Sequence, residues 1–130
     1  MTRPCFLVID PEHAGSISSR KLVLETAKFN VVTAYGSHEA IETLRRFPAM
    51  DGVVVNASMA DMPCADLIRG LRSIRPEVHI IAISSPMARS CEGANRQLES
   101  FDPPRLLDLL RELCPTQTRE ILNREEELAG

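Results

Sequence analysis

Short apolar runs alternate along this chain with segments in which apolar residues recur at helical spacing. The runs predict buried strands, because β-branched and other apolar side chains pack well on a sheet that is covered on both faces. Each run is followed closely by a polar, glycine or proline residue, which marks its end. Five strands are predicted, at residues 6–9, 31–34, 53–55, 78–83 and 95–99, and the last of them is polar and weak.

The first two intervening segments predict helices of different quality. The first, which ends near residue 28, has a loose apolar pattern. The second starts after Gly36, with Ser37 as the expected N-cap, and Pro48 terminates it. Its expected apolar face consists of Ala40, Ile41, Leu44 and Phe47.

The third helix has the clearest amphipathic pattern in the chain. It is expected to begin with Pro63 at its first position and to end at Pro76. Its buried stripe is Leu67, Ile68, Leu71 and Ile74. The opposite stripe, which we expect to face solvent, is Arg69, Arg72 and Arg75.

The carboxyl-terminal third predicts one short helix and one ordinary helix. Residues 85–93 leave room for about two turns, close to the lower limit for a parallel crossover, so this fourth helix is expected to be shortened. Asp102 is expected to cap the last helix, which Pro115 ends. The expected buried stripe of that helix is Leu106, Leu107, Leu110 and Leu113. We therefore predict a domain at 1–114 and a charged tail or short helix at 115–130.

Alternating strands and helices predict an α/β domain with a parallel sheet covered on both faces. In such sheets ligands bind outside the carboxyl ends of the strands. Four polar residues follow strand ends and should meet at that edge: Asp10, Asn56, Ser84 and Glu99.

Composition narrows the class of protein. The chain has 130 residues, 44% hydrophobic and 25% charged, with a formal net charge of −3, which is typical of one globular domain and argues against nucleic-acid binding by charge. No apolar stretch reaches the roughly 20 residues needed to span a bilayer. The amino terminus does not resemble a signal peptide. We expect a cytoplasmic protein.

The cysteines show no metal-binding or redox spacing. Cys5, Cys64, Cys91 and Cys114 form no C-x-x-C pair, so we expect reduced thiols. A reactive thiol at Cys64, at the start of the third helix, is the alternative to a simple packing role there.

Five ordered segments carry a family resemblance: FLVID, VVTAYGSHEAIETLRRF, VVVNASMADM, HIIAISS and ESFDPPRLLDLL. Together they resemble the receiver domain of bacterial response regulators, the CheY-like members of the flavodoxin-like fold, over residues 4–114. The resemblance implies a doubly wound five-stranded parallel sheet, (βα)5, with strand order 2-1-3-4-5. It also implies a place in two-component (phosphorelay) signal transduction.

In that family an aspartate after the third strand accepts a phosphoryl group. Two acidic residues help to bind Mg²⁺, and a lysine and a hydroxyl stabilise the transferred group. The equivalent positions here are Asp10 and Pro11 for the acidic pair, Asn56 for the acceptor, Ser84 for the hydroxyl, Glu99 for the lysine and Arg96 for the switch aromatic residue. Glu12 would serve as the second acid only if the loop were displaced by one residue.

These departures predict that the phosphorylation chemistry is lost. The Asn56 amide is a very poor nucleophile, and Glu99 puts negative charge where a phosphoryl group needs positive charge. No cofactor is expected. Asp10 and Glu12, with Glu99, offer at most a weak Mg²⁺ site.

We therefore predict a non-enzymatic pseudo-receiver. Its expected role is phosphorylation-independent binding of a protein partner, such as a histidine kinase or another signalling protein, with no nucleic-acid or membrane ligand. The alternative is a small phosphatase of the haloacid-dehalogenase type, because Asp10-Pro11-Glu12 distantly resembles that family's D-x-D motif.

Overall fold

Five strands and four helices make up the described part of the chain. The computed structural model describes residues 4–10, 19–57, 61–83, 91, 93–98 and 102–113. The strands are β1 (Cys5–Ile9), β2 (Asn30–Ala34), β3 (Gly52–Asn56), β4 (His79–Ile83) and β5 (Arg96–Leu98). The helices are α1 (Ser19–Thr26), α2 (Ser37–Arg46), α3 (Cys64–Ile74) and α4 (Pro103–Leu113).

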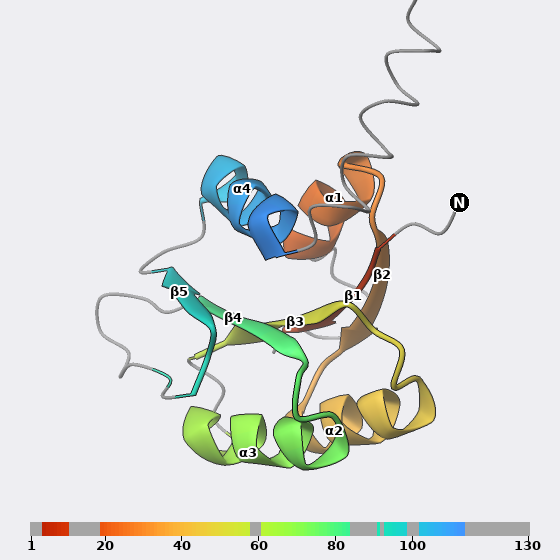
Figure 1. Cartoon of the computed structure of the whole chain (residues 1–130), viewed down its shortest axis with the longest axis vertical. Coiled ribbons are helices and arrows are strands. Elements are labelled where there is room, and N and C mark those ends of the chain that lie inside the picture. Colours follow the sequence, from red (N-terminus) through yellow and green to blue (C-terminus); the bar gives the residue numbers. More distant parts are fainter. Residues whose placement is uncertain are drawn as a thin grey trace, which may run out of the picture.

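The strands form one parallel sheet in the order β2-β1-β3-β4-β5. Helices α1 and α4 cover one face, and α2 and α3 cover the other (Figure 1). This is the doubly wound arrangement and strand order predicted from the sequence. Of the expected fourth helix at 85–93, only residues 91 and 93 are described, and neither of them is helical. The tail at 115–130 lies outside the described residues.

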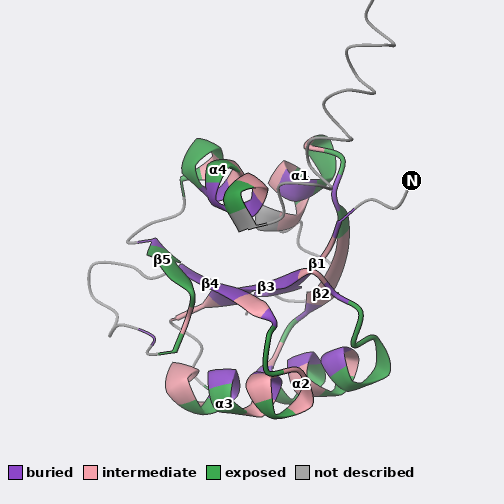
Figure 2. Ribbon diagram, in the orientation of Figure 1, coloured by how far each residue is buried: buried purple, intermediate pink, exposed green. Residues whose placement is uncertain are grey.

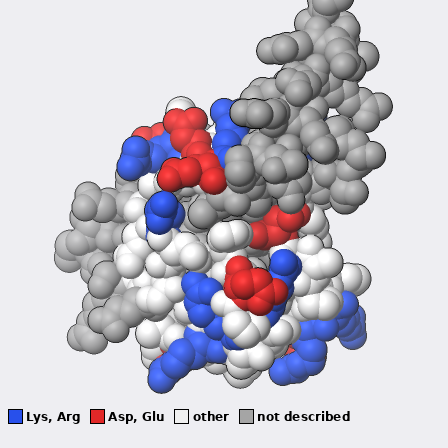
Figure 3. Space-filling view, viewed as in Figure 1, with Lys and Arg blue, Asp and Glu red and all other residues white. Residues whose placement is uncertain are grey.

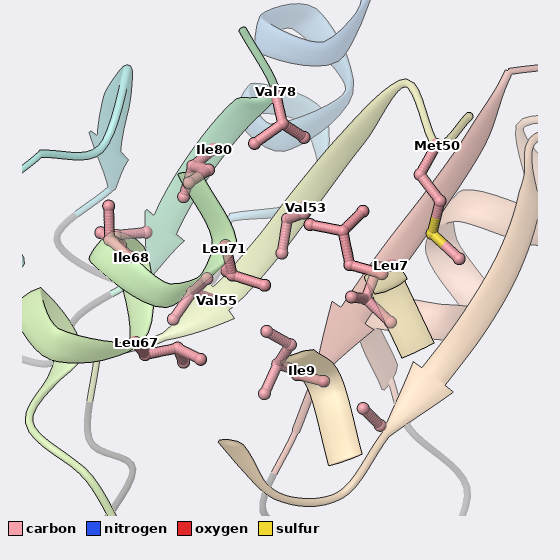
Figure 4. Packing of buried hydrophobic residues seen from close by; sticks show 14 of the residues in the cluster. Leu7, Ile9, Met50, Val53, Val55, Leu67, Ile68, Leu71, Val78 and Ile80 are labelled. Atoms are coloured by element: carbon pink, nitrogen blue, oxygen red, sulfur yellow. The ribbon is translucent and has the colours of Figure 1, made fainter. Parts of the chain in front are cut away.

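The sheet has an apolar cluster on each face, which explains why its central strands are apolar throughout. Toward α2 and α3, side chains of β1, β3 and β4 meet Leu44, Leu67 and Leu71. Figure 4 shows Leu67 and Leu71 of α3 pointing into the same cluster as Val53 and Val55 of β3.

Toward α1 and α4, the alternate side chains of the same strands meet the other two helices. Phe6 packs against Phe29 with ring centroids 5.3 Å apart in an edge-on geometry. Leu24, Leu106 and Leu110 complete this second cluster. Figure 2 shows the central strands buried between the two helical layers. No helix in the described ranges is both long enough and apolar enough to cross a membrane.

Two details of the predicted apolar faces are wrong. Phe47 lies one residue beyond α2 and is 57% exposed. The helix ends at Arg46, so the helical spacing that would place the ring on the apolar face does not extend to Phe47. In α4, Leu109 is buried with Leu106 and Leu110 although the predicted stripe omits it.

The arginines of α3 differ from one another, contrary to the uniform solvated stripe that was predicted. Arg69 is exposed and pairs with the neighbouring Asp66. Arg72 instead donates to the carbonyl oxygens of Val78 at 3.0 Å and Gly93 at 2.9 Å. Arg75 donates to the Pro48 carbonyl oxygen at 2.8 Å. These two side chains cross-link loops, because their length lets them reach carbonyl groups beyond the end of the helix.

The start of α2 also differs from the prediction. Gly36 occupies the N-cap position and Ser37 is the first helical residue, fully buried. The side chain that caps this helix comes from elsewhere: Asp61 accepts hydrogen bonds from the Ser37 backbone N–H at 2.7 Å and from its hydroxyl at 2.9 Å.

Candidate functional site

Asp10 and Asn56 stand side by side at the carboxyl edge of the sheet. Strands β1 and β3 are paired in register at Ile9 and Val55, and each of the two polar residues comes directly after its member of that pair. Strand pairing therefore places Asp10 and Asn56 next to each other. Their roles as the first acidic position and the acceptor position stay a prediction.

Backbone hydrogen bonds fix both positions. The Asp10 N–H donates to the Ala34 carbonyl oxygen of β2 at 2.9 Å. On the other side, Asn56 is in register with Ile83 of β4, and the N–H of Ala57 donates to the Ile83 carbonyl oxygen at 2.9 Å. The Asp10 side chain is fully buried, whereas Asn56 is partly exposed.

The other predicted pocket residues fall outside the described part of the chain. These are Pro11, Glu12, Ser84 and Glu99. The strands that lead to the last two are described, and they are paired at their final residues, Ile83 and Leu98. The arrangement of these four side chains around Asn56 remains a prediction.

Arg96 lies on β5 with its side chain exposed. Its guanidinium pairs with the carboxylate of Glu112 on α4 at 3.3 Å and also donates to the Asn95 carbonyl oxygen. The position that the resemblance equates with an aromatic switch residue thus holds a charged side chain tied to the last helix.

Asp61 joins the loop after β3 to the start of α2. Hydrogen bonds from the Ser37 backbone N–H and hydroxyl hold the pKa of the Asp61 carboxyl below its usual value, and the nearby His38 adds a smaller effect in the same direction. Sequence reasoning missed this contact because the cap and the helix are 24 residues apart. Two features of the sequence could have pointed to it. The predicted helix starts at Gly36-Ser37, where the N-cap position has no side chain, and an acidic residue, Asp61, lies in the loop after the third predicted strand.

Cys64 and Cys91 form a disulfide, with Cα atoms 5.3 Å apart. The expectation of reduced thiols was therefore wrong for these two residues. Their sequence separation of 27 carries no motif, so only the three-dimensional fold reveals that the two cysteines meet. The bond joins the first residue of α3 to the connection between β4 and β5.

An apolar cavity of about 420 Å³ lies at the opposite end of the sheet. It is bordered by Cys5 at the start of β1 and by Phe47 and Met50 before β3. Burial, and secondarily the neighbouring Asp51 carboxylate, raises the pKa of the Cys5 thiol. Parallel sheets place their ligands at the other edge, so this cavity is separate from the Asp10–Asn56 corner.

The described residues do not supply the donor set that the fold family uses for Mg²⁺. Within those ranges, no three His, Cys, Asp or Glu side chains are grouped so that they could hold a metal ion. Among the described residues, the corner contributes one carboxylate, from Asp10, and one amide, from Asn56. Mg²⁺ prefers carboxylate oxygens in near-octahedral geometry, so these two side chains by themselves fit it poorly.

Solved structures to which this chain is similar include receiver domains of response regulators. A receiver-domain protein (CheY-like) from Methanospirillum hungatei superposes with a TM-score of 0.75 at 20% identity, covering 92% of this chain and 99% of that one. A receiver-domain protein from Clostridium thermocellum gives a TM-score of 0.69 at 23% identity, covering 96% and 98%. The chain has the receiver-domain fold.

The chain is also similar to part of a larger protein. A protein described as a probable two-component system response regulator/GGDEF domain protein matches at 26% identity and a TM-score of 0.69, covering 88% of this chain and 50% of that one. No protein-family model and no curated protein matches this sequence. Nothing in these comparisons favours the haloacid-dehalogenase alternative.

Proposed function

We propose that this chain is a receiver-like module of a two-component signalling pathway that binds a protein partner without being phosphorylated. The observation that carries the proposal is Asn56. In a receiver fold it occupies the end of β3, beside the buried Asp10, where an acceptor aspartate would have to stand. An amide cannot form the acyl phosphate, so the chemical step has no nucleophile.

The remaining departures point in the same direction. Pro11 removes one carboxylate at the second acidic position, and Glu99 reverses the charge at the lysine position. Arg96 puts a charged side chain, paired with Glu112 at the surface, where the resemblance would place an aromatic switch residue. We infer that neither Mg²⁺ nor a phosphoryl group acts at this corner, and that the protein is not an enzyme.

The surface supports a protein partner over nucleic acid. Figure 3 shows both signs of charge on the face in view. Arg45, Arg69 and Arg75 are each paired with an acidic neighbour, so α2 and the solvent side of α3 do not form an uninterrupted basic patch. Nucleic-acid binding needs such a patch to neutralise phosphates. A cytoplasmic location remains a prediction.

The test is a restoration series. Wild type, Asn56→Asp and the triple variant Pro11→Asp/Asn56→Asp/Glu99→Lys are each incubated with Mg²⁺ and beryllofluoride, and amide NMR shifts are followed. We expect the amide shifts of residues 52–57 to stay the same in wild type and to change in the triple variant. After incubation with acetyl phosphate, intact mass should show a phosphoryl group on the triple variant and none on wild type. Stoichiometric labelling of wild type at this corner would disprove the proposal.

A binding experiment tests whether the protein binds its partner without phosphorylation or whether binding once depended on phosphorylation. A candidate histidine kinase is tested against wild type and Asn56→Asp, with and without acetyl phosphate. Equal affinity in all four combinations is expected. Binding only to the phosphorylated Asn56→Asp protein would contradict phosphorylation-independent binding.

A further inference from the structure

The Cys64–Cys91 pair lies at the same edge of the sheet as Asn56. Cys64 ends the connection that leaves β3, and Cys91 lies in the connection that leaves β4. These two strands are adjacent, and Asn56 and Ile83 at their ends are in register. The bond therefore cross-links the connection that follows β3 to the connection that follows β4.

Contacts other than the disulfide also hold this segment in place. The Cys91 carbonyl oxygen accepts a hydrogen bond from the Gln97 side-chain amide at 3.1 Å. Two residues further on, Gly93 is held by Arg72, which also donates to the Asn95 side chain at 2.8 Å. The Cys91 side chain is 1% exposed within the apolar cluster under α3, where a thiol packs as a small hydrophobic group. None of these contacts involves the disulfide, so the same partners are present in the reduced chain.

The two sulfurs differ in access. Cys64 is partly exposed, and Cys91 is buried. Cys64 is also the first residue of the 11-residue helix α3, and the dipole of a helix favours a thiolate at its amino terminus. A small oxidant reaches Cys64 first, and Cys91 is then the thiol in position to complete a disulfide.

We propose that Cys64 and Cys91 form a reversible redox pair that clamps the β4–β5 connection to the start of α3. The oxidant is a hydroperoxide. The Cys64 thiolate attacks the peroxide oxygen and becomes a sulfenic acid, releasing hydroxide that takes up the thiol proton as water. The Cys91 sulfur then attacks the Cys64 sulfur, and its proton leaves with the hydroxyl as a second water. Two thiols and one hydrogen peroxide give one disulfide and two waters, and a dithiol reverses the reaction by exchange.

This inference does not rest on the proposed function. It supplies a chemical input at the corner where the phosphorylation chemistry has no nucleophile. The redox experiments contain no phosphodonor. The redox proposal can therefore be disproved while the proposed function stands, and the proposed function can be disproved while the redox proposal stands.

The first test counts thiols. The Cys5→Ser/Cys114→Ser variant, which keeps only the pair, is equilibrated with glutathione buffers, alkylated and weighed by mass spectrometry. We expect the two alkyl groups to be lost together as the buffer becomes more oxidising, with half-conversion inside the range of ratios tested. Two thiols at every ratio would overturn the proposal, and so would a disulfide that persists at every ratio.

The second test assigns the roles. In the same background, Cys91→Ser treated with hydrogen peroxide should accumulate a sulfenic acid at Cys64 that dimedone traps. Cys64→Ser should give much less trapping, because its remaining thiol is buried. Equal trapping in the two variants would contradict the assignment.

The third test measures the clamp. Amide hydrogen exchange at residues 93–98 and 64–68 should be about tenfold faster in the reduced protein, while exchange in β1 and β2 stays the same. An unchanged far-UV circular dichroism spectrum would show that the reduced chain is still folded. Identical exchange in both redox states would refute a clamping role.

Discussion

At the level of single residues, Asp61 and Ser37 form a contact between two separate elements. It satisfies two donors at the start of α2 with one carboxylate, although the N-cap position itself holds a glycine. Because unpaired N–H groups at a helix start are costly, the capping role passes to a residue on another element. The loop after β3 is thereby fixed to α2.

Replacing Asp61 with alanine should destabilise the protein by about 1 kcal/mol, the usual effect of losing a helix N-cap. Asp61→Asn is the matched control, since its amide oxygen can still accept from the Ser37 N–H, and it should lose less than half as much. Urea unfolding of the three proteins measures the difference. Equal losses for both variants would show that the negative charge, not the hydrogen bond, is what matters.

The same contact predicts a pH dependence. The hydrogen bonds hold the pKa of Asp61 in the folded protein below the ordinary value of an aspartate carboxyl, so the unfolded chain binds the proton more readily. The stabilisation is therefore complete well above that value and disappears as the pH falls through the lowered folded pKa. The stability difference between wild type and Asp61→Asn, measured at about pH 6 and pH 3, should shrink at the lower pH. A difference that grows toward acid pH would contradict this assignment.

At the level of elements, Arg72 connects α3 to the strands beside it. Its guanidinium donates to the carbonyl oxygens of Pro76, Val78 and Gly93 and to the Asn95 side chain. The Asn95 side chain in turn accepts from the Ile80 N–H at 2.8 Å. One side chain thus sets the spacing between the end of α3, the start of β4 and the start of β5.

Substituting Arg72 with lysine should cost about 2 kcal/mol, because an ammonium group lacks the planar fork that reaches several acceptors and leaves part-buried carbonyl groups unsatisfied. The control is Arg69→Lys on the same helix. Arg69 is 77% exposed and pairs with Asp66 at the surface, so its substitution should change stability by less than about 0.5 kcal/mol. Urea denaturation at one pH compares the two. Similar losses at both positions would mean that the Arg72 network adds no stability.

Strands and helices could be predicted where the local sequence pattern determines them. Contacts could not be predicted where they depend on a residue far along the chain. Apolar runs and helical spacing were sufficient for five strands and the clear helices, and parallel pairing was sufficient to bring Asp10 and Asn56 together. The cap from Asp61 and the reach of Arg72 depend on residues far along the chain. Phe47 was misplaced because one residue of helix length decides which way its ring points.

At the level of the whole molecule, the domain consists of two apolar clusters separated by a sheet, and the disulfide adds a cross-link to only one of them. Cys91 belongs to the cluster beneath α2 and α3. The cluster beneath α1 and α4 has no such link among the described residues. Disulfide connectivity could not be predicted from four cysteines without motif spacing, because three pairings are possible for two bonds and more if only one forms.

Removing the cross-link should lower global stability because the unfolded chain gains freedom. For a sequence separation of 27, the loop-entropy relation gives about 3.5 kcal/mol, which corresponds to a drop in melting temperature of roughly 10 °C for a domain of this size. The double variant Cys64→Ser/Cys91→Ala and wild type in excess dithiol should melt at similar temperatures. Calorimetry with and without dithiol measures both.

The controls separate the bond from the side chains. Adding dithiol to the double variant should leave its melting temperature unchanged. Cys5→Ala, which removes a thiol that is not bonded, should keep full sensitivity to dithiol. If wild type melts at one temperature in both redox conditions while thiol counting shows that the bond has broken, the cross-link contributes nothing to the stability of the folded chain. The two apolar clusters and the hydrogen bonds of Arg72 would then carry the whole of it.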